Sequence, residues 1–242
     1  MIDILMKYRN TTIYWLFALL FVVAPFYYSG NFGGVGLGLP FNITVWMAAY
    51  TIMFYLIVCL IVNKQFLVFE KLWMIIAFPF LIVVSGFFSG YISANIWLFR
   101  QLFVFSGVLF LVLLLQIKIR DSDVDNILMM VVLSTIIHSA IGIKQVVLSN
   151  IIISVIDISI NPIPEGIFQQ INVQASYLST GIIIAFYLIA RPSYKYRKFY
   201  EKLILLIAIF LGSFVISNSG SRVGFLSLFM GLFILLIAFK KE

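Results

Sequence analysis

The chain has 242 residues, of which 63% are hydrophobic and only 10% are charged, and its mean hydropathy is +1.14. A soluble domain typically contains about 25% charged residues and about 45–50% apolar ones, so this composition excludes an ordinary water-soluble globule. We predict an integral membrane protein. The net charge of +7 does not indicate nucleic-acid binding, because the basic residues lie between hydrophobic runs and form no stripe.

Eight hydrophobic segments follow one another along the chain, most of them about long enough to cross ~30 Å of hydrocarbon. They cover residues 12–28, 42–62, 72–90, 97–117, 125–147, 173–190, 203–217 and 223–239. Outer-membrane barrels show alternating patterns instead of such continuous apolar runs. We therefore predict an all-α, polytopic transmembrane helical bundle of about eight helices, forming a single transmembrane domain over residues 1–242.

The basic residues predict how this bundle is oriented. Lys7 and Arg9 precede the first apolar run as in a signal peptide, but no small-x-small cleavage site follows, so we expect a retained first helix. If the N-terminus is cytoplasmic, thirteen of the 16 Lys and Arg residues fall on the cytoplasmic side. The positive-inside rule then predicts that both termini are cytoplasmic.

Three cations fall on the other side of the membrane in this topology. Arg100, Lys144 and Arg222 lie at the predicted outward ends of the fourth, fifth and eighth segments. A charge within the bilayer costs about 2.5–3.5 kcal/mol on insertion scales, so such residues are candidates for function. Each one alone is explained equally well by snorkelling to the interface. Three at one face favour a site for an anion.

The two long outward connections differ in character. Residues 29–41 are glycine-rich but have no GK[ST] sequence and no preceding strand, so we expect an extended or re-entrant loop there and not a phosphate-binding loop. Residues 148–172 contain two prolines, a glycine and several amides before the sixth segment. Irregular backbone at membrane depth survives where it faces protein or water, so this connection is predicted to line a polar cavity.

Three stretches of the sequence resemble one bacterial enzyme superfamily. Residues 164–178, PEGIFQQINVQASYL, resemble the P-x-G-x-F-x-Q-x-N-x-x-A-x-x-L signature of the O-antigen ligase and protein O-oligosaccharyltransferase superfamily. Residues 33–46, GGVGLGLPFNITVW, resemble a segment of its protein-glycosylating branch. Residues 217–228, SNSGSRVGFLSL, resemble its S-x-SR-x-G helix start. The pilin-glycosylating branch is favoured by the FQQxN and LPFN details.

The resemblance implies a multi-pass enzyme of the bacterial inner membrane that acts on the periplasmic face. Such enzymes take a glycan from an undecaprenyl-pyrophosphate carrier and transfer it to lipid A core, to a growing polysaccharide, or to a Ser or Thr of an exported protein. Arg222 lies in the matched SR motif and is our first candidate to bind the donor pyrophosphate, followed by Arg100 and Lys144. No cofactor is implied.

The catalytic base is not assigned by the resemblance. Members of the superfamily continue into a large periplasmic loop that carries a histidine proposed to activate the acceptor. This chain ends at Glu242, so we expect it to correspond to the N-terminal half. The one histidine, His138, lies in the fifth segment and is not equated with the loop histidine. It is either a packing residue or a general base, and Gln145 follows it at i+7 on the same expected face.

Several other polar residues are candidates for contacts with the glycan or its carrier. Gln169, Gln170 and Asn172 are expected either to bind sugar hydroxyls or phosphate or to cap the sixth helix, and Gln170 and Asn172 occupy the signature positions. Asp157 and Glu165 are weaker candidates, which either orient an acceptor hydroxyl or are simply solvated.

Other functional classes remain open from the sequence. Within the same superfamily, the alternative is an O-antigen ligase or polysaccharide polymerase. A membrane transporter lined by the intramembrane cations is another class, although no internal repeat supports it. An inactive fragment that retains only donor binding is a further alternative. The sequence contains no Cys/His metal cluster or nucleophile elbow, so metalloenzyme and hydrolase interpretations have no support.

Overall fold

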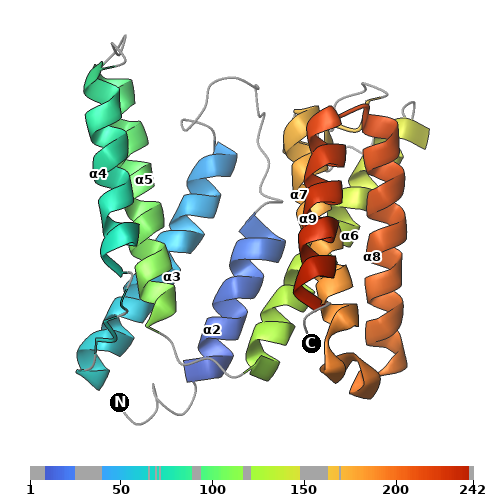
Figure 1. Ribbon diagram of the computed structural model, residues 1–242, viewed down its shortest axis with the longest axis horizontal. Coiled ribbons are helices and arrows are strands. Elements are labelled where there is room, and N and C mark those ends of the chain that lie inside the picture. The colour runs from blue at the N-terminus through green and yellow to red at the C-terminus, as the bar shows by residue number, and fades with distance from the viewer. Residues whose placement is uncertain are drawn as a thin grey trace. The chain divides into compact units, whose positions relative to one another are not determined.

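The structure is a computed structural model that describes residues 9–24, 40–64, 66–68, 70, 72–88, 94–116, 121–147, 163–168 and 170–239. Within these residues the chain is helical and contains no strand (Figure 1). In chain order the elements are α2 (Arg9–Ala18), the π-helical η1 (Leu19–Val23), α3 (Pro40–Asn63), α4 (Leu72–Phe88), α5 (Ala94–Leu115), α6 (Asp121–Val147), the short 3-10 turn η4 (Gly166–Phe168), α7 (Ile171–Ala190), the 3-10 turn η5 (Pro192–Tyr196), α8 (Phe199–Ser219) and α9 (Arg222–Phe239).

Every predicted hydrophobic segment coincides with a helix in the described part of the chain. Five of these helices are long and apolar enough to cross a membrane. They contain residues Thr44–Val62, Asp123–Val147, Ile171–Ala190, Phe199–Ser219 and Arg222–Phe239. The prediction of an all-α, multi-pass membrane protein is therefore confirmed, whereas the side on which the termini lie stays a prediction.

Helices α6 and α8 begin four residues before the predicted hydrophobic segments. The extra turn of α6 contains Asp121 and Asp123, and that of α8 contains Glu201 in its first turn. Carboxylates interact favourably with the positive end of the helix dipole. Because they are polar, a segment chosen by its hydropathy does not include them. The starts of α6 and α8 are thus more polar than the hydrophobic runs that follow them.

The chain divides into two compact units. Unit 1 consists of residues 1–10 and 49–120, and unit 2 of residues 11–48 and 121–242. Within unit 1, α4 packs along α5. The Tyr50 hydroxyl there forms a 2.8 Å hydrogen bond with the Ser106 hydroxyl. The side-chain amide of Gln116 spans the backbone of Leu67, with which it exchanges two hydrogen bonds of 2.7 and 3.1 Å.

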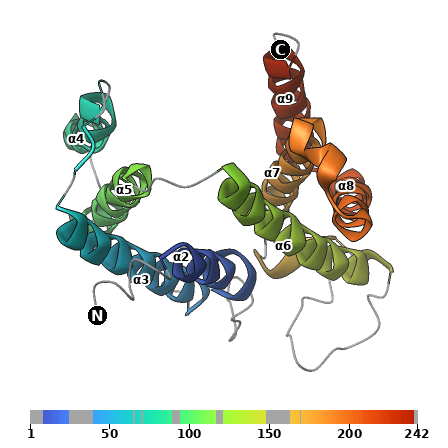
Figure 2. The same cartoon turned by 90° about the horizontal axis from the view of Figure 1, so that it is seen from below.

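Helix α7 is the centre of unit 2. It packs against α6, α8 and α9, and the view along the helices shows it between them (Figure 2). Its fully buried apolar side chains recur every three or four residues, as expected for one face of a helix. They are Ala175, Leu178, Ile182, Ala185 and Leu188. Opposite them lie Val132 of α6 and Leu205, Ala208, Val215 and Ile216 of α8.

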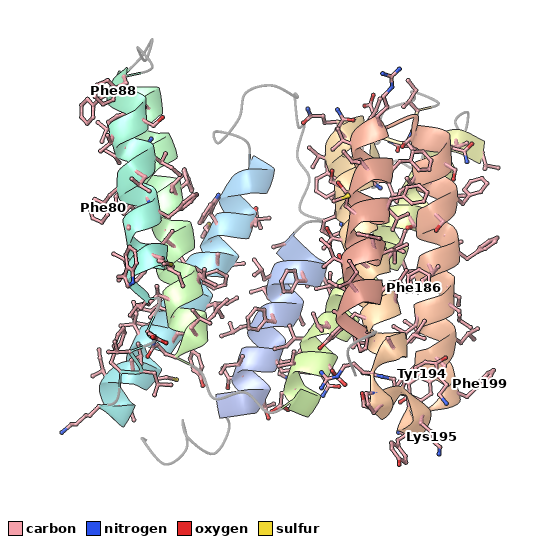
Figure 3. All side chains as sticks on the ribbon, viewed as in Figure 1. Phe80, Phe88, Phe186, Tyr194, Lys195 and Phe199 are labelled. Atoms are coloured by element: carbon pink, nitrogen blue, oxygen red, sulfur yellow. The ribbon has the colours of Figure 1, made fainter. Side chains whose placement is uncertain are left out.

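Large apolar side chains cover much of the outer surface of both units. Phe80 and Phe88 of unit 1 and Phe199 of unit 2 are exposed, as the side-chain view shows (Figure 3). On α9 only Gly224 is buried, although the residues after Arg222 are almost all apolar. In water such surfaces are unfavourable, whereas against lipid chains they are not, so this distribution agrees with a membrane location.

Candidate functional site

The residues that resemble the superfamily signature gather at one end of unit 2. We call it the signature end, and it is formed by the end of α6, residues 163–168, the start of α7, the end of α8 and the start of α9 (Figure 1). These elements meet there because consecutive helices of unit 2 run in opposite directions. Hydrogen bonds join α6 to residues 163–168 and α7 to the residue that precedes α9.

A side-chain amide on α6 holds the Pro-Glu-Gly turn. The Gly166 N–H donates to Gln145 Oε1 at 2.8 Å, and Gln145 Nε2 donates to the Gly166 carbonyl at 3.3 Å. Both residues are buried. The amide therefore satisfies both polar groups of a buried backbone unit, which would otherwise cost about 1–3 kcal/mol each.

Gly166 is required at this position for two reasons. Its φ angle is +62°, in the left-handed region that disfavours residues with a Cβ atom. A Cβ atom at Gly166 would also overlap the side-chain amide of Gln174. Gln174 is itself fixed, because its Nε2 donates a 3.0 Å hydrogen bond to the carbonyl of His138. The turn, α6 and α7 are thus locked together by neighbouring amides.

The imidazole of His138 is packed among aromatic rings. Its relative exposure is 0%, and it stacks on Phe168 with 5.1 Å between ring centroids and an interplanar angle of 18°. Tyr177 meets it edge-on at 4.8 Å, and the Tyr177 hydroxyl bonds to Ser134 at 2.7 Å. This environment favours the packing interpretation of His138. Gln145 at i+7 is equally buried, so the two share the inner face of α6.

A tight turn joins α8 to α9 at the SR motif. Gly220 ends α8 in the left-handed conformation, with a φ of +66°. Ser221 then caps α9, because its Oγ accepts the N–H of Gly224 at 3.1 Å. The same hydroxyl donates to Asn172 Oδ1 at 2.8 Å. The polar run between the two segments is therefore a turn, and its serine links the start of α9 to the start of α7.

Helices α7 and α9 approach each other closely just below this turn. A Cβ atom on Gly224 would lie 2.5 Å from the Cβ of Ala175. The Ser179 hydroxyl donates to the Gly224 carbonyl at 2.8 Å and also lies 2.7 Å from the Ala175 carbonyl. Small residues and a serine at a crossing are typical of membrane helices, where they allow backbones to approach. The position of α9 relative to the signature is fixed by this contact.

The structure brings two of the three candidate cations to the signature end. Arg222 is the first residue of α9 and is exposed, and Lys144 lies in the last turn of α6 with a relative exposure of 9%. Arg100 belongs to α5 in unit 1, and its side chain lies outside the described part of the structure. A joint site of all three cations stays a prediction.

The remaining candidates are distributed around the same end of unit 2. Asn172 and Gln170 are exposed, and Gln170 is the N-cap residue of α7, although its side chain makes no capping hydrogen bond. Glu165 is half-buried in the turn. Gln169 and Asp157 lie outside the described residues.

A shallow groove of about 410 Å³ runs along the outer side of α7 from the signature end. It is lined by Asn172, Val173, Ser176, Tyr177 and Thr180. Asn172, Ser176 and Thr180 recur at i, i+4 and i+8, so they form one polar stripe along the helix. Our sequence reasoning missed Ser176 and Thr180, although their spacing from Asn172 was a readable signal. It also missed the structural roles of Gln174 and Ser221.

Comparison with known proteins gives one match. Residues 164–189 match the family model of the protein glycosylation ligases. The matched segment contains the Pro-Glu-Gly turn and almost all of α7, and it ends before the SR motif. No curated protein and no solved structure matches the chain. The match supports an enzyme that transfers a glycan to a protein.

Proposed function

We propose that this chain transfers a glycan from an undecaprenyl-pyrophosphate carrier to a Ser or Thr hydroxyl of a protein, on the periplasmic face of the bacterial inner membrane. One observation carries the proposal. The segment that matches the protein glycosylation ligases starts with a locked turn, and its Asn172 is hydrogen-bonded to Ser221, the neighbour of Arg222. The resemblance of the sequence to both motifs is thereby supported by a physical connection between them.

The proposed reaction is a substitution at the anomeric carbon of the first sugar. The acceptor oxygen forms a bond to C1, the bond from C1 to the pyrophosphate oxygen breaks, and undecaprenyl pyrophosphate leaves with the electron pair. The hydroxyl proton passes to a base that we do not assign among the described residues. Negative charge accumulates on the leaving group, and fixed cations in a partly dry site stabilise it.

Arg222 and Lys144 are suited to different parts of that task. The Arg222 guanidinium is exposed and can make two parallel hydrogen bonds to a phosphate. Lys144 is mostly buried and contributes a point charge from the last turn of α6. The N-terminus of α7 points its free N–H groups to the same end, which also favours an anion. Asn172 and Gln170 are the candidates for hydrogen bonds to the glycan or carrier.

The proposal is tested by assaying the purified chain in nanodiscs with a lipid-linked oligosaccharide and a serine-containing acceptor protein. Mass spectrometry of the acceptor detects the glycan. We expect transfer by the unmodified chain and a loss of about 100-fold or more in the Arg222→Ala variant, which is the size of effect seen when one transition-state donor is removed. The Arg222→Lys variant should also be impaired, because it cannot bind bidentately.

Val223→Ala is the matched control. Val223 is the next residue of α9 and is also exposed, so its truncation tests whether the helix start tolerates a change. This control should retain normal transfer, and both variants should insert into membranes as the unmodified chain does. Unchanged transfer by Arg222→Ala would remove this residue from the site. Absence of transfer by the unmodified chain, both alone and with a polypeptide that supplies the periplasmic loop histidine, would overturn the proposed activity.

A further inference from the structure

The end of unit 2 opposite the signature end carries a separate polar cluster. Helix α7 ends there, and the α7–α8 loop, which we define as residues 191–202, leads through η5 into the first turn of α8. Asp125 of α6 is buried beneath it. Arg191 Nη1 lies 2.7 Å from Asp125 Oδ1, and Arg197 Nη2 and Ser193 Oγ donate to Asp125 Oδ2 at 3.1 and 3.0 Å.

This buried carboxylate holds the loop in one shape. Three donors from the loop converge on the two oxygens of Asp125, and Arg197 is also paired with Glu201 at 3.3 Å. Charge-assisted hydrogen bonds of this kind are stronger and more directional than neutral ones. The two arginines are therefore committed to the structure of the loop.

The three lysines of the loop do not bind Asp125, although Lys202 Nζ donates a 3.3 Å hydrogen bond to the Lys195 carbonyl within the loop. Lys195 and Lys198 are exposed, and Lys202 is half-buried. Lys198 Nζ lies 5.6 Å from the centre of the Tyr200 ring, and Lys202 Nζ lies 5.0 Å from the Tyr194 ring. The loop and Asp125 together contain five cations against two carboxylates, and Asp121 and Asp123 in the first turn of α6 add two more carboxylates at this end, so one positive charge remains in excess.

Aromatic side chains project from the same surface. Tyr196 is 84% exposed and Phe199 is 81% exposed, and Tyr200 is exposed as well. Figure 3 shows Tyr194, Lys195 and Phe199 together at this end of unit 2. The loop connects two helices that are each long and apolar enough to cross a membrane, so it lies at the level of the lipid headgroups. Aromatic residues are enriched at that depth, with the ring among acyl chains and the polar atom in the interface.

We propose that the α7–α8 loop is a binding surface for the phosphate headgroup of an anionic phospholipid. Lys195, Lys198 and Lys202 bind the phosphate, while Tyr196 and Phe199 insert beside the acyl chains. The Asp125 cluster holds these side chains in position before the lipid arrives. Charge complementarity selects an anionic headgroup over a zwitterionic one, and the exposed rings suit a lipid surface and not an aqueous partner. The proposal does not depend on the glycan-transfer activity.

The test measures lipid selectivity of the full chain. The protein is purified in a mild detergent with equal amounts of phosphatidylglycerol and phosphatidylcholine, and native mass spectrometry counts the lipids retained. We expect enrichment of phosphatidylglycerol that falls with added salt, because the lysines are near the surface. Lys198→Gln should lower this enrichment about fivefold, which is the effect of one basic residue near an anionic surface. Lys64→Asn removes an exposed lysine from the end of α3 and should leave it unchanged.

Two further variants separate a shaped site from simple charge attraction. Asp125→Asn makes the protein more positive, so attraction alone would increase phosphatidylglycerol binding, whereas loss of the preformed loop should decrease it. Phe199→Ser leaves the charge unchanged at a highly exposed position, and we expect it to reduce retention several-fold without affecting folding. Equal retention of both lipids by the unmodified chain, or no effect of Lys198→Gln and Phe199→Ser, would overturn the proposal. Increased phosphatidylglycerol enrichment in the Asp125→Asn variant would contradict a site that is preformed by the Asp125 cluster.

Discussion

The side-chain amide of Gln145 is bonded to both the N–H and the carbonyl of Gly166, in the middle of the turn that opens the family-matched segment. An amide used in this way imitates the backbone of a neighbouring strand. The same arrangement occurs between Gln116 and Leu67 in unit 1, but at an exposed position. These two contacts, one buried and one exposed, allow the effect of burial on the stability gained from such hydrogen bonds to be measured within one protein.

Gln145→Ala should lower the free energy of unfolding by about 1–3 kcal/mol, because two backbone groups lose their partner away from water. Gln116→Ala should cost less than about 1 kcal/mol, since water replaces the exposed amide. Titration of both variants with sodium dodecyl sulfate, followed by circular dichroism, measures the difference. Equal losses in the two variants would contradict a buried clamp at Gly166.

Gly166→Ala is expected to be more harmful than Gly220→Ala. Both glycines have φ angles near +60°, at +62° and +66°, so both substitutions incur left-handed strain of about 1–2 kcal/mol. A Cβ at Gly220 meets no atom within 4 Å, whereas one at Gly166 overlaps Gln174. We expect the additional loss in Gly166→Ala to appear in thermal unfolding and in glycan transfer. A larger loss of stability in Gly220→Ala would show that the overlap between the new Cβ at position 166 and Gln174 is easily relieved.

Gly224→Ala should separate α9 from α7. The added Cβ would lie 2.5 Å from Ala175, on a helix backbone that cannot rotate away. We expect a loss of about 1–3 kcal/mol, the usual effect of overpacking. Gly231→Ala on the same helix is the control, because its Cβ would overlap the Cδ1 and Cγ1 atoms of Ile183, a longer side chain that can change rotamer. Thermal unfolding in detergent measures the loss of stability in both variants. An equal loss in Gly224→Ala and Gly231→Ala would argue against a close helix crossing at Gly224.

Ser221→Ala and Asn172→Ala separate capping from positioning. Ser221→Ala removes both the cap of α9 and the bond to Asn172, so stability should fall by about 1 kcal/mol and glycan transfer should fall with it. Asn172→Ala leaves the cap intact at an exposed position, so we expect near-normal stability with reduced transfer. Parallel measurements of unfolding and of product formation test this. Normal transfer by Asn172→Ala would mean that the link to Ser221 does not position Arg222.

The sequence predicted the candidate site only in part. The signature positions Gln170 and Asn172 and the cation Arg222 were recognisable because their order along the chain resembles a motif. The buried partners Gln174 and Ser221 were not recognised, because their roles depend on contacts with other helices. His138 was open to two interpretations, and only the structure shows that Phe168 and Tyr177 lie against its ring, which favours a packing role.

The sequence by itself determined the eight helical segments and the membrane class of this protein. Both follow from local physics, since a backbone in hydrocarbon must satisfy its own hydrogen bonds, and an apolar run of sufficient length forms a helix wherever it occurs. Only the tertiary structure decided that Gln145 meets Gly166, that Asn172 meets Ser221 and that Asp125 gathers two arginines. These contacts join residues 21 to 72 positions apart. They arise from which helix faces are turned toward each other, and that depends on how whole helices pack.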